Sequence, residues 1–385
     1  MRLLLLAPGE LTLDPRARRA ATAALAAGYD VIGVCGARPG ESPAPLEGVS
    51  VTRVRTGRAT AGLRSTVAAS RGSFAHGFFR VARLLLLNAR LARAAKRRGP
   101  FDVVHANDFD TLLAGRRAAR PSNARLVYDA HEIYADQEPD APALYRRFVR
   151  TLEGPLARRA AAVVTVSDPI ADELFGSLRL ESPPIVVLNC PPISTAEPLP
   201  QQDGPLRAVY QGAMGPGRPI RDLLDALETS DEVELTIRVV GADLAELRAQ
   251  IAERGLQTIV SVAEPVPPDR LVEALSGFHA GLVINRPLTR NDELVFPNKL
   301  FEYLMAGLAV IVPRLPGLAS LVDAEEIGLT YEPGQPAALG AALTQLAREP
   351  SRVAAMRKRA RQLALERYNA EAQTGCLLTA WGTQA

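Results

Sequence analysis

The sequence predicts an α/β protein made of two Rossmann-like domains, each a doubly wound parallel sheet with helices on both faces. Short, uniformly apolar runs alternate with amphipathic segments along almost the whole chain, and the pattern starts again after residue 205. Runs without polar alternation are typical of strands buried on both faces of a parallel sheet. At 385 residues the chain is also too long for one ordinary hydrophobic core.

Each series of predicted elements begins with a buried strand. The strand runs of the first series are RLLLLAP, DVIGVCG, DVVHAN, LVYDAHE and AVVTVSD, with an Ala-rich helix at residues 16–27. Those of the second series are RAVYQG, LTIRVVG, TIVSVAE, AGLVIN and AVIVP. The helices between them are IRDLLDALE, LAELRAQIAERG, DRLVEALSG and a segment that starts at Pro297 and runs to about Ala306.

The domain boundary lies in residues 189–205, because this stretch is rich in proline and polar residues, as a linker is. We assign residues 1–195 to the first domain and residues 196–369 to the second. The last helix starts at about Ser351 and is too long for a single partner. Its final part, at about 370–385, is expected to pack back on the first domain.

Composition and cysteine usage are typical of a soluble cytoplasmic protein. Hydrophobic residues make up 47% of the chain and charged residues 23%, and no apolar run approaches the roughly 18–20 residues that span a bilayer. The opening MRLLLLAPGE predicts a buried strand, not a signal peptide. Cys35, Cys190 and Cys376 have neither disulfide nor zinc spacing. Motifs of serine hydrolases and zinc enzymes are absent.

Charge is distributed unevenly, although the net charge is only +3. Residues 48–101 contain no Asp or Glu. The basic residues of this acid-free block are Arg53, Arg55, Arg58, Arg64, Arg71, Arg80, Arg83, Arg90, Arg93, Lys96, Arg97 and Arg98. A block of one sign predicts an anionic partner. The chain uses Arg in preference to Lys throughout, so solvated helix faces are the alternative explanation.

A glycine-rich loop follows the first strand of the second series. In YQGAMGPGRPI, Gly212, Gly215 and Gly217 precede Arg218, and Pro219 is placed to start a helix. Glycines let backbone N–H groups approach an anion, and Arg218 adds a bidentate phosphate contact. The loop lacks the Gly-Lys-Ser/Thr ending of a Walker loop. A phosphate site and a plain turn therefore fit this loop equally well.

Three polar residues stand near the start of the helix that begins at Pro297. Asn298 and Lys299 fall in the first turn, where backbone N–H groups are free, and Glu302 lies one turn further on the same face. A phosphate on the first turn and a sugar diol on Glu302 fit this placement. A surface ion pair of Lys299 with Glu302 explains the charges, but not their position after a buried strand.

Two histidines follow predicted strands directly, and each has acids close by. A His at a strand end donates hydrogen bonds or acts as an acid or base, although a buried, backbone-bonded His is the common alternative. The first group is His105, Asn107, Asp108 and Asp110; the second is Asp129, His131 and Glu132. The Asp-x-Asp pattern in the first group is too short to predict a metal site. Ser167 or Asp168 is expected to cap a helix.

Taken in order, these segments resemble the GT-B fold retaining glycosyltransferases of family 4 (glycosyl transferases group 1). The resemblance covers both domains through DPRARRAATAALAAGYDVIGV, DVVHANDFDTL, LVYDAHE, VVLNCPP, YQGAMGPGRPIRDLLDAL and ELVFPNKLFEYLMAGLAVIVP. It implies transfer of a sugar from a nucleoside diphosphate sugar, UDP first among the nucleotides, to an acceptor hydroxyl. The product would be a glycolipid, a polysaccharide or a natural-product glycoside. The first domain would hold the acceptor and the second the donor.

The resemblance also implies roles for single residues. Glu302 matches the second Glu of a Glu-x7-Glu motif, which holds the ribose. The donor diphosphate would be bound by the backbone of Asn298 and Lys299 and by Arg218, and His131 would lie near the reacting sugar. The remaining donor-side residues would be Gly212 in the loop, Gly241 and Ala242, and Ala263 to Val266 with Glu264 around the base. Acceptor-side candidates are Glu10, His105, Asp108 and Glu132.

The sequence departs from the family pattern at three places. The first Glu of the motif falls on Leu294, so that Glu293 or Asp292 would take over its contact with the donor sugar. Ala213 stands where an Arg often follows the loop glycine. The first loop, APGE, holds a single glycine.

The expected partners are the nucleotide sugar and a sugar, lipid-linked or small-molecule acceptor, without metal, other cofactor or nucleic acid. Within the acid-free block, residues 53–98 are expected to contact an anionic membrane surface at the inner face of the cell membrane. A soluble acceptor is the alternative. A nucleotide-sugar epimerase of the same fold and a non-catalytic nucleotide-sugar-binding protein also remain open.

Overall fold

The computed structural model describes residues 1–37, 45–55, 74–200, 204–213, 219–230, 232–241 and 243–383. The chain forms two compact units. The first contains Met1–Leu188, Thr289–Asn291 and Thr374–Ala385, and the second contains Asn189–Leu288 and Asp292–Gln373.

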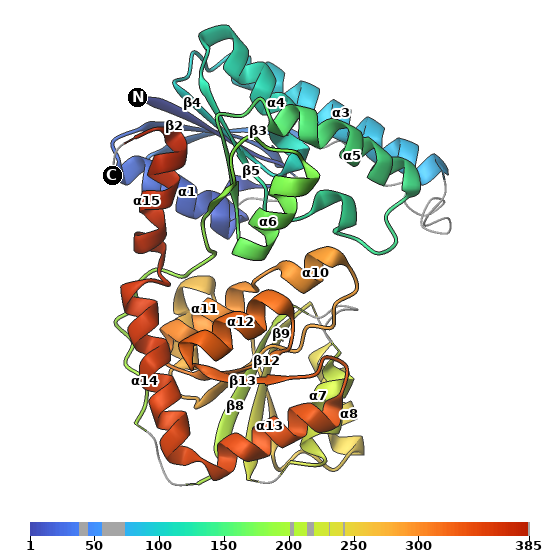
Figure 1. Cartoon of the computed structure of the whole chain (residues 1–385), viewed down its shortest axis with the longest axis vertical. Coiled ribbons are helices and arrows are strands. Elements are labelled where there is room, and N and C mark those ends of the chain that lie inside the picture. The colour runs from blue at the N-terminus through green and yellow to red at the C-terminus, as the bar shows by residue number, and fades with distance from the viewer. Residues whose placement is uncertain are drawn as a thin grey trace. The chain divides into compact units, whose positions relative to one another are not determined.

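The first unit is built on a parallel sheet with the strand order β3-β2-β1-β4-β5-β6-β7 (Figure 1). Its strands are β1 (Arg2–Ala7), β2 (Asp30–Ala37), β3 (Val49–Arg55), β4 (Val103–Asn107), β5 (Arg125–Asp129), β6 (Ala162–Thr165) and β7 (Ile185–Val186). The order reverses at β1, so that β1 pairs with β2 on one side and with β4 on the other. In open sheets of this kind ligands bind beyond the carboxyl ends of the strands next to this reversal.

Helices cover both faces of the first sheet. They are α1 (Pro15–Ala26), α3 (Phe74–Lys96), α4 (Phe109–Ala119), α5 (Ala143–Ala157), α6 (Asp168–Ser177) and α15 (Ala370–Trp381), with short 3-10 turns at Leu11–Leu13, Arg120–Ser122 and Tyr134–Asp136. Leu3, Leu5 and Val127 share one buried cluster with the alanines of α1 and with Trp381 of α15. On the opposite face the backbone of α4 lies close to the sheet, because a Cβ on Gly115 would be 2.9 Å from that of Ala106.

The second unit repeats the design with a parallel sheet of order β10-β9-β8-β11-β12-β13. Its strands are β8 (Leu206–Ala213), β9 (Val233–Val240), β10 (Val260–Ala263), β11 (Ala280–Leu282), β12 (Ala309–Pro313) and β13 (Gly328–Tyr331). Its helices are α7 (Ile220–Leu227), α8 (Leu244–Glu253), α9 (Leu271–Leu275), α10 (Arg290–Leu294), α11 (Asn298–Met305), α12 (Pro316–Glu325), α13 (Pro336–Arg348) and α14 (Pro350–Glu366), with a 3-10 turn at Pro268–Arg270.

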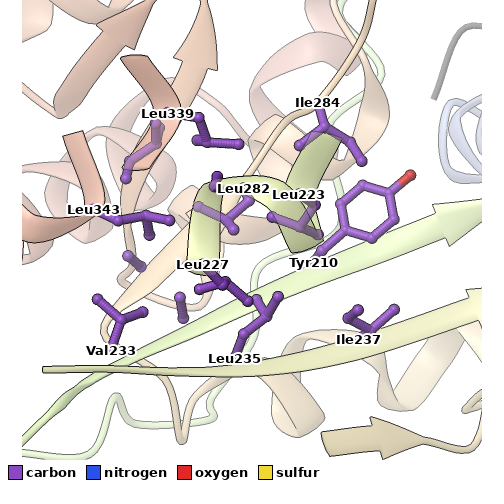
Figure 2. Close-up of a cluster of buried hydrophobic side chains, with 14 of the residues drawn as sticks. Tyr210, Leu223, Leu227, Val233, Leu235, Ile237, Leu282, Ile284, Leu339 and Leu343 are labelled. Atoms are coloured by element: carbon purple, nitrogen blue, oxygen red, sulfur yellow. The ribbon is translucent and has the colours of Figure 1, made fainter. Parts of the chain in front are cut away.

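The main core of the second unit lies between this sheet and helices α7, α8 and α13. Figure 2 shows Leu223 and Leu227 of α7 and Leu339 and Leu343 of α13 gathered with Tyr210 and other strand residues. The apolar side chains of α7 recur every three to four residues, which places them on this face. Helix α11 lies on the opposite face of the sheet, over Gly281.

The predicted fold class is confirmed, and two helix boundaries differ from expectation. Pro297 precedes α11 as its cap instead of forming its first turn. The segment predicted as one last helix forms two, α14 and α15, and the Asn369 side chain caps both of them. It donates to the carbonyl oxygens of Ala364 and Leu365 at the end of α14, and it accepts a hydrogen bond from the Ala372 N–H of α15 at 2.7 Å.

Ser167 is the residue that caps α6, accepting a hydrogen bond from the N–H of Ile170. Among the described helices, none is long and apolar enough to cross a membrane.

Candidate active site

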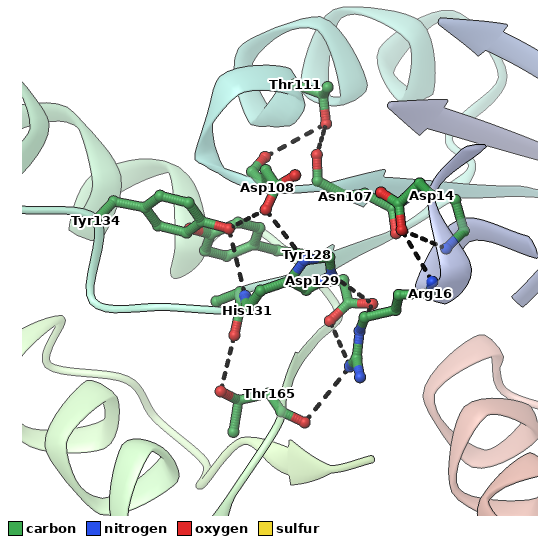
Figure 3. Close-up of polar contacts among 12 residues, drawn as sticks. Asp14, Arg16, Asn107, Asp108, Thr111, Tyr128, Asp129, His131, Tyr134 and Thr165 are labelled. Atoms are coloured by element: carbon green, nitrogen blue, oxygen red, sulfur yellow. Dashed lines mark hydrogen bonds and ion pairs between the residues drawn. The ribbon is translucent and has the colours of Figure 1, made fainter. Parts of the chain in front are cut away.

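A buried carboxylate organises the carboxyl ends of β4 and β5 in the first unit. Asp129 ends β5 beside Asn107 of β4 and has no exposed surface. Arg16, on the first turn of α1, forms a bidentate ion pair with this carboxylate, with Nε 2.8 Å from Oδ2 and Nη2 2.7 Å from Oδ1 (Figure 3). Burial by itself would raise the pKa of Asp129, but Arg16 and the neighbouring histidines hold it well below its usual range.

His131 lies between two carboxylates. Its Nδ1 is 3.1 Å from Oδ1 of Asp108, and its Nε2 is 3.4 Å from Oδ2 of Asp129. Burial lowers the pKa of His131, but the two carboxylates outweigh this and raise it to about 10. His131 is therefore an imidazolium at neutral pH, which donates hydrogen bonds but cannot accept a proton from a substrate.

Asp108 is held in a strained conformation at the start of α4. Its φ of 67° is in the left-handed region, which is unfavourable for a residue with a side chain. Its backbone N–H donates to the carbonyl oxygen of Asp129, and the Tyr134 hydroxyl donates to its Oδ1 at 2.5 Å. Burial raises the pKa of Asp108, but His131 lowers it further, so it remains a carboxylate. The side chains of Asp108 and His131 are 21% and 17% exposed, so a ligand can reach them.

His105 is fully buried between Asp129 and the end of α15. Its Nε2 is 3.2 Å from Oδ2 of Asp129, and its Nδ1 is 3.0 Å from the indole nitrogen of Trp381. This acceptor-side candidate has no exposed surface and lies beneath the surface of the first unit.

Glu10, another acceptor-side candidate, is also buried. Its side chain is 1% exposed and is held by Arg53, with Nε 2.7 Å from Oε2 and Nη2 3.0 Å from Oε1. Burial raises the pKa of Glu10, whereas the hydrogen bonds and charge of Arg53 lower it further. Glu132, beside His131, is half-buried.

In the second unit, one tyrosine fixes the position of α11 on the sheet. The Tyr303 hydroxyl donates to the carbonyl oxygen of Leu282 on β11 and accepts from the N–H of Gln211 on β8, both at 3.1 Å. Its ring lies so close to Gly281 that a Cβ there would be 2.3 Å from a ring carbon. This close approach requires glycine, and it brings the first turns of α11 over the ends of β8 and β11.

The predicted donor residues Gly212, Lys299 and Glu302 lie together at this point. Glu302 accepts a hydrogen bond from the side-chain Nε2 of Gln211 at 2.7 Å. The Lys299 ammonium lies 4.3 Å from the centre of the Tyr210 ring. Gly212 has a φ of 147°, and a Cβ there would be 2.7 Å from Nζ of Lys299. A side chain at position 212 would therefore displace the Lys299 ammonium from its present position.

The other predicted donor residues lie around this cluster or outside the described residues. Asn298 is exposed at the start of α11. Gly241 follows β9 with a φ of 77°, and Glu264, after β10, is exposed and paired with Arg248. Glu293 is half-buried in α10, next to Leu294, which is buried. Arg218, Gly215, Gly217 and Ala242 lie outside the residues that the structure describes.

Sequence reasoning missed Arg238, a half-buried guanidinium in β9. Strand register places it beside Gln211 of β8 and Ala263 of β10. Its Nε and Nη1 are buried and have no hydrogen-bond partner among the described residues, and burial lowers its pKa. The signal in the sequence is a single Arg inside the apolar run LTIRVVG. Arg238 supplies a cation on β9, the strand that pairs with the segment of β8 ending at Ala213.

The roles of Arg16 and Trp381 were also missed, because their partners lie far away along the chain.

Within the described part of the chain, no group of three or more His, Cys, Asp or Glu side chains is placed to hold a metal ion.

Comparison with known proteins relates both halves of the chain to glycosyl transferases. Two family models match the chain: a glycosyl transferase 4-like domain over residues 13–191 and a glycosyl transferase-like domain over residues 218–378. The D-inositol 3-phosphate glycosyltransferase of Acidothermus cellulolyticus is 25% identical over 284 residues, which are 66% of this chain. The match spans 61% of that relative's length.

Solved structures share the fold of the whole chain. Sucrose-phosphate synthase from Thermosynechococcus elongatus superposes with a TM-score of 0.76 at 16% identity, over 97% of this chain and 96% of that one. The chain is a GT-B glycosyltransferase of the group 1, family 4 type. The Anabaena protein HepE, solved in complex with UDP, is a second neighbour of this glycosyltransferase, with a TM-score of 0.71 at 16% identity over 99% of this chain and 100% of that one.

The charge of His131 makes the stability of this glycosyltransferase depend on pH. The pKa of His131 is about 10 in the folded protein, against an ordinary 6.5, so folding favours its protonated form. This contribution to the free energy of unfolding is complete below the ordinary value and is lost as the pH rises through the folded value. We expect the stability difference between the wild type and His131→Gln to shrink from about pH 7 to about pH 9.5, as measured by urea unfolding. A difference that stays constant over this range would contradict the assigned charge.

Proposed function

We propose that this glycosyltransferase transfers a sugar from a nucleoside diphosphate sugar, a UDP-sugar in the first place, to an acceptor hydroxyl with retention of anomeric configuration. The observation that carries the proposal is the cluster of Gly212, Lys299 and Glu302 at the start of α11. It combines an ammonium, a helix start and a carboxylate, which suit a diphosphate and a ribose. HepE complexes with UDP and with UDP-glucose support the nucleotide.

The leaving diphosphate gains negative charge as the bond from the sugar C1 to its phosphate oxygen breaks. Lys299 and the first N–H groups of α11 stabilise that charge without the need for a metal. Arg238 adds a further positive charge on the second unit. Gln211, bonded to Glu302, holds that carboxylate ready to accept the two ribose hydroxyls.

The first unit supplies His131 and Asp108 to the reacting sugars. His131 is an imidazolium, so it donates a hydrogen bond to a sugar hydroxyl and does not deprotonate the acceptor. In a retaining transfer with attack from the face of departure, the acceptor proton passes to the leaving phosphate oxygen while the acceptor oxygen bonds to C1. Asp108, as an ionised and reachable carboxylate, accepts a hydrogen bond from a sugar hydroxyl.

For the acceptor, we propose a lipid-linked molecule on an anionic membrane surface, approached through α3. In this helix Phe74 is 75%, Phe78 58% and Leu86 51% exposed, and Phe79 and Leu85 are exposed on the same helix. These apolar side chains recur at helical spacing, as on a helix that lies in a membrane interface. The exposed cations of α3 are Arg83, Arg93 and Lys96.

Two arginines of the acid-free block are paired with carboxylates in the first unit and do not contribute to this surface as free charges. Arg53 is held by Glu10. Arg80 is held by Glu138 at 2.6 Å and lies 4.0 Å from the centre of the Tyr145 ring. Arg58, Arg64 and Arg71 lie outside the described residues.

Replacing Glu302 tests the donor site. We expect Glu302→Ala to lower kcat/KM for a UDP-sugar by about 100-fold or more, because the ribose hydroxyls lose a charged hydrogen-bond partner. UDP release would be measured with radiolabelled UDP-sugars and an extract of acceptors. The exposed Glu234, on the same unit, gives the matched control Glu234→Ala, which should be fully active.

Unchanged activity in Glu302→Ala would refute the assigned site. If UDP release requires no acceptor and the sugar is converted to its epimer, the protein is an epimerase. If a UDP-sugar binds but nothing is released with any acceptor fraction, the protein is a non-catalytic binder.

Sedimentation with vesicles tests the membrane contact. We expect the wild type to pellet with vesicles that contain anionic lipid but not with neutral ones, and to be released by salt. The double variant Phe78→Ser, Phe79→Ser should stay in the supernatant, whereas Leu13→Ser, which removes a 60% exposed leucine elsewhere on the first unit, should pellet. Equal recovery of the wild type in the supernatant with both kinds of vesicle would exclude the membrane surface and favour a soluble acceptor.

A further inference from the structure

A continuous chain of buried contacts joins the last turn of the C-terminal helix to His131. The indole Nε1 of Trp381 is 3.0 Å from Nδ1 of His105. His105 Nε2 is 3.2 Å from Oδ2 of Asp129, and the same oxygen is 3.4 Å from Nε2 of His131. Trp381 is 2% exposed, and His105 and Asp129 have no exposed surface, whereas the His131 side chain at the end of this chain of contacts is 17% exposed.

The chemistry of the indole decides which nitrogen of His105 carries the proton. An indole N–H only donates, so Nδ1 of His105 must accept with its lone pair. The remaining proton of the neutral ring then sits on Nε2, where it points at Asp129 and donates to Oδ2. Trp381 therefore fixes the tautomer of His105.

The tautomer of His105 matters because two histidines share one carboxylate oxygen. Oδ2 of Asp129 already accepts from Nε of Arg16 and from His105. If His105 took a second proton, Asp129 would face another cation and attract His131 less. The other titratable groups that face this chain are Asp108 and Tyr134 at His131, and Tyr29, whose ring lies 5.7 Å from that of Trp381.

We propose that Trp381 is a positioning residue of the active site, which keeps the proton on His131 by fixing the tautomer of His105 against Asp129. The buried contacts give α15 this role in addition to packing. The role in proton placement follows from the first unit alone, and only its effect on rate rests on the proposed function.

The packing of Trp381 makes a conservative test possible. Its ring meets His105 and Tyr29 edge to face, with centroid distances of 5.9 and 5.7 Å, and Arg125 Nε donates to the neighbouring carbonyl oxygen of Ala380 at 2.8 Å. Trp381→Phe keeps an aromatic ring in this place, but it removes the N–H donor together with part of the indole ring. The matched control is Tyr29→Phe, which removes the hydroxyl paired with Thr383 and leaves the Trp381 N–H untouched.

The experiment is a pH titration of the full-length protein with 15N-labelled histidine, followed by nuclear magnetic resonance. The chain has only four histidines, so each imidazole can be assigned by its own substitution. In the wild type and in Tyr29→Phe, His105 should remain in the Nε2–H form and His131 should remain doubly protonated beyond neutral pH. In Trp381→Phe, Nδ1 of His105 should become protonated, and the titration of His131 should move down by about one pH unit or more.

A second pair of variants protects the test against a loss of folding. In His105→Gln the side-chain amide donates to Asp129 without any tautomer, so adding Trp381→Phe to it should leave the His131 titration unchanged. If Trp381→Phe alone does not fold, His105→Gln and His105→Asn replace it. The longer amide should preserve the wild-type titration of His131, and the shorter one, which does not reach Asp129, should lower it.

Enzyme kinetics separate this proposal from the proposed function. The alkaline limb of the kcat/KM profile for a UDP-sugar should move down together with the His131 titration in Trp381→Phe. Unchanged His105 and His131 spectra in Trp381→Phe would overturn the positioning role. Shifted spectra with an unshifted rate profile would support that role and instead contradict the assignment of His131 to the reaction.

Discussion

The first unit depends on one interaction, the fork of Arg16 on the buried carboxylate of Asp129. An ionised carboxylate without exposed surface is very costly unless it is paired and hydrogen-bonded. Arg16 meets both demands, and its remaining nitrogen donates to the carbonyl oxygen of Val187 at 2.7 Å. The pair therefore joins α1 to the end of β5, and the bond to Val187 joins α1 to the residue that follows β7. The Asp129 carboxylate in turn orients His105 and His131, each of which places Nε2 toward its Oδ2.

In the second unit, glycines leave room for side chains of α11, whereas in the first unit a charged pair organises the polar residues. The Tyr303 ring packs α11 against the sheet because Gly281 leaves room for it. The Lys299 ammonium lies beside Gly212 of β8, which has no side chain. Both units thus place their polar groups at the carboxyl ends of parallel strands, where the sheet order reverses. The cationic and hydroxyl-binding groups suited to a nucleotide sugar lie in one unit, and the imidazolium and carboxylate suited to its sugars lie in the other.

The sequence predicts the fold well, because apolar runs and helix signals are local. It also singles out His131, Lys299 and Glu302 as site candidates, because polar residues after a buried strand or at the start of an apolar helix stand out against their surroundings. What it could not predict are pairings between distant segments. Neither the Arg16–Asp129 pair, 113 residues apart, nor the Trp381–His105 contact, 276 residues apart, leaves a local pattern. For the same reason, the pairing of Glu10 with Arg53 and of His105 with Trp381 leaves no local signal in the sequence.

A double-mutant cycle on Arg16 and Asp129 tests the central claim most directly. The free energy of unfolding would be measured by urea denaturation for Arg16→Met, Asp129→Asn and the double variant near neutral pH. Each single variant should lose about 3–5 kcal/mol, because a buried charge or donor set is left without its partner. The double variant should lose less than the sum, with a coupling of about 2–3 kcal/mol. Additive losses would contradict the claim that this pair organises the site.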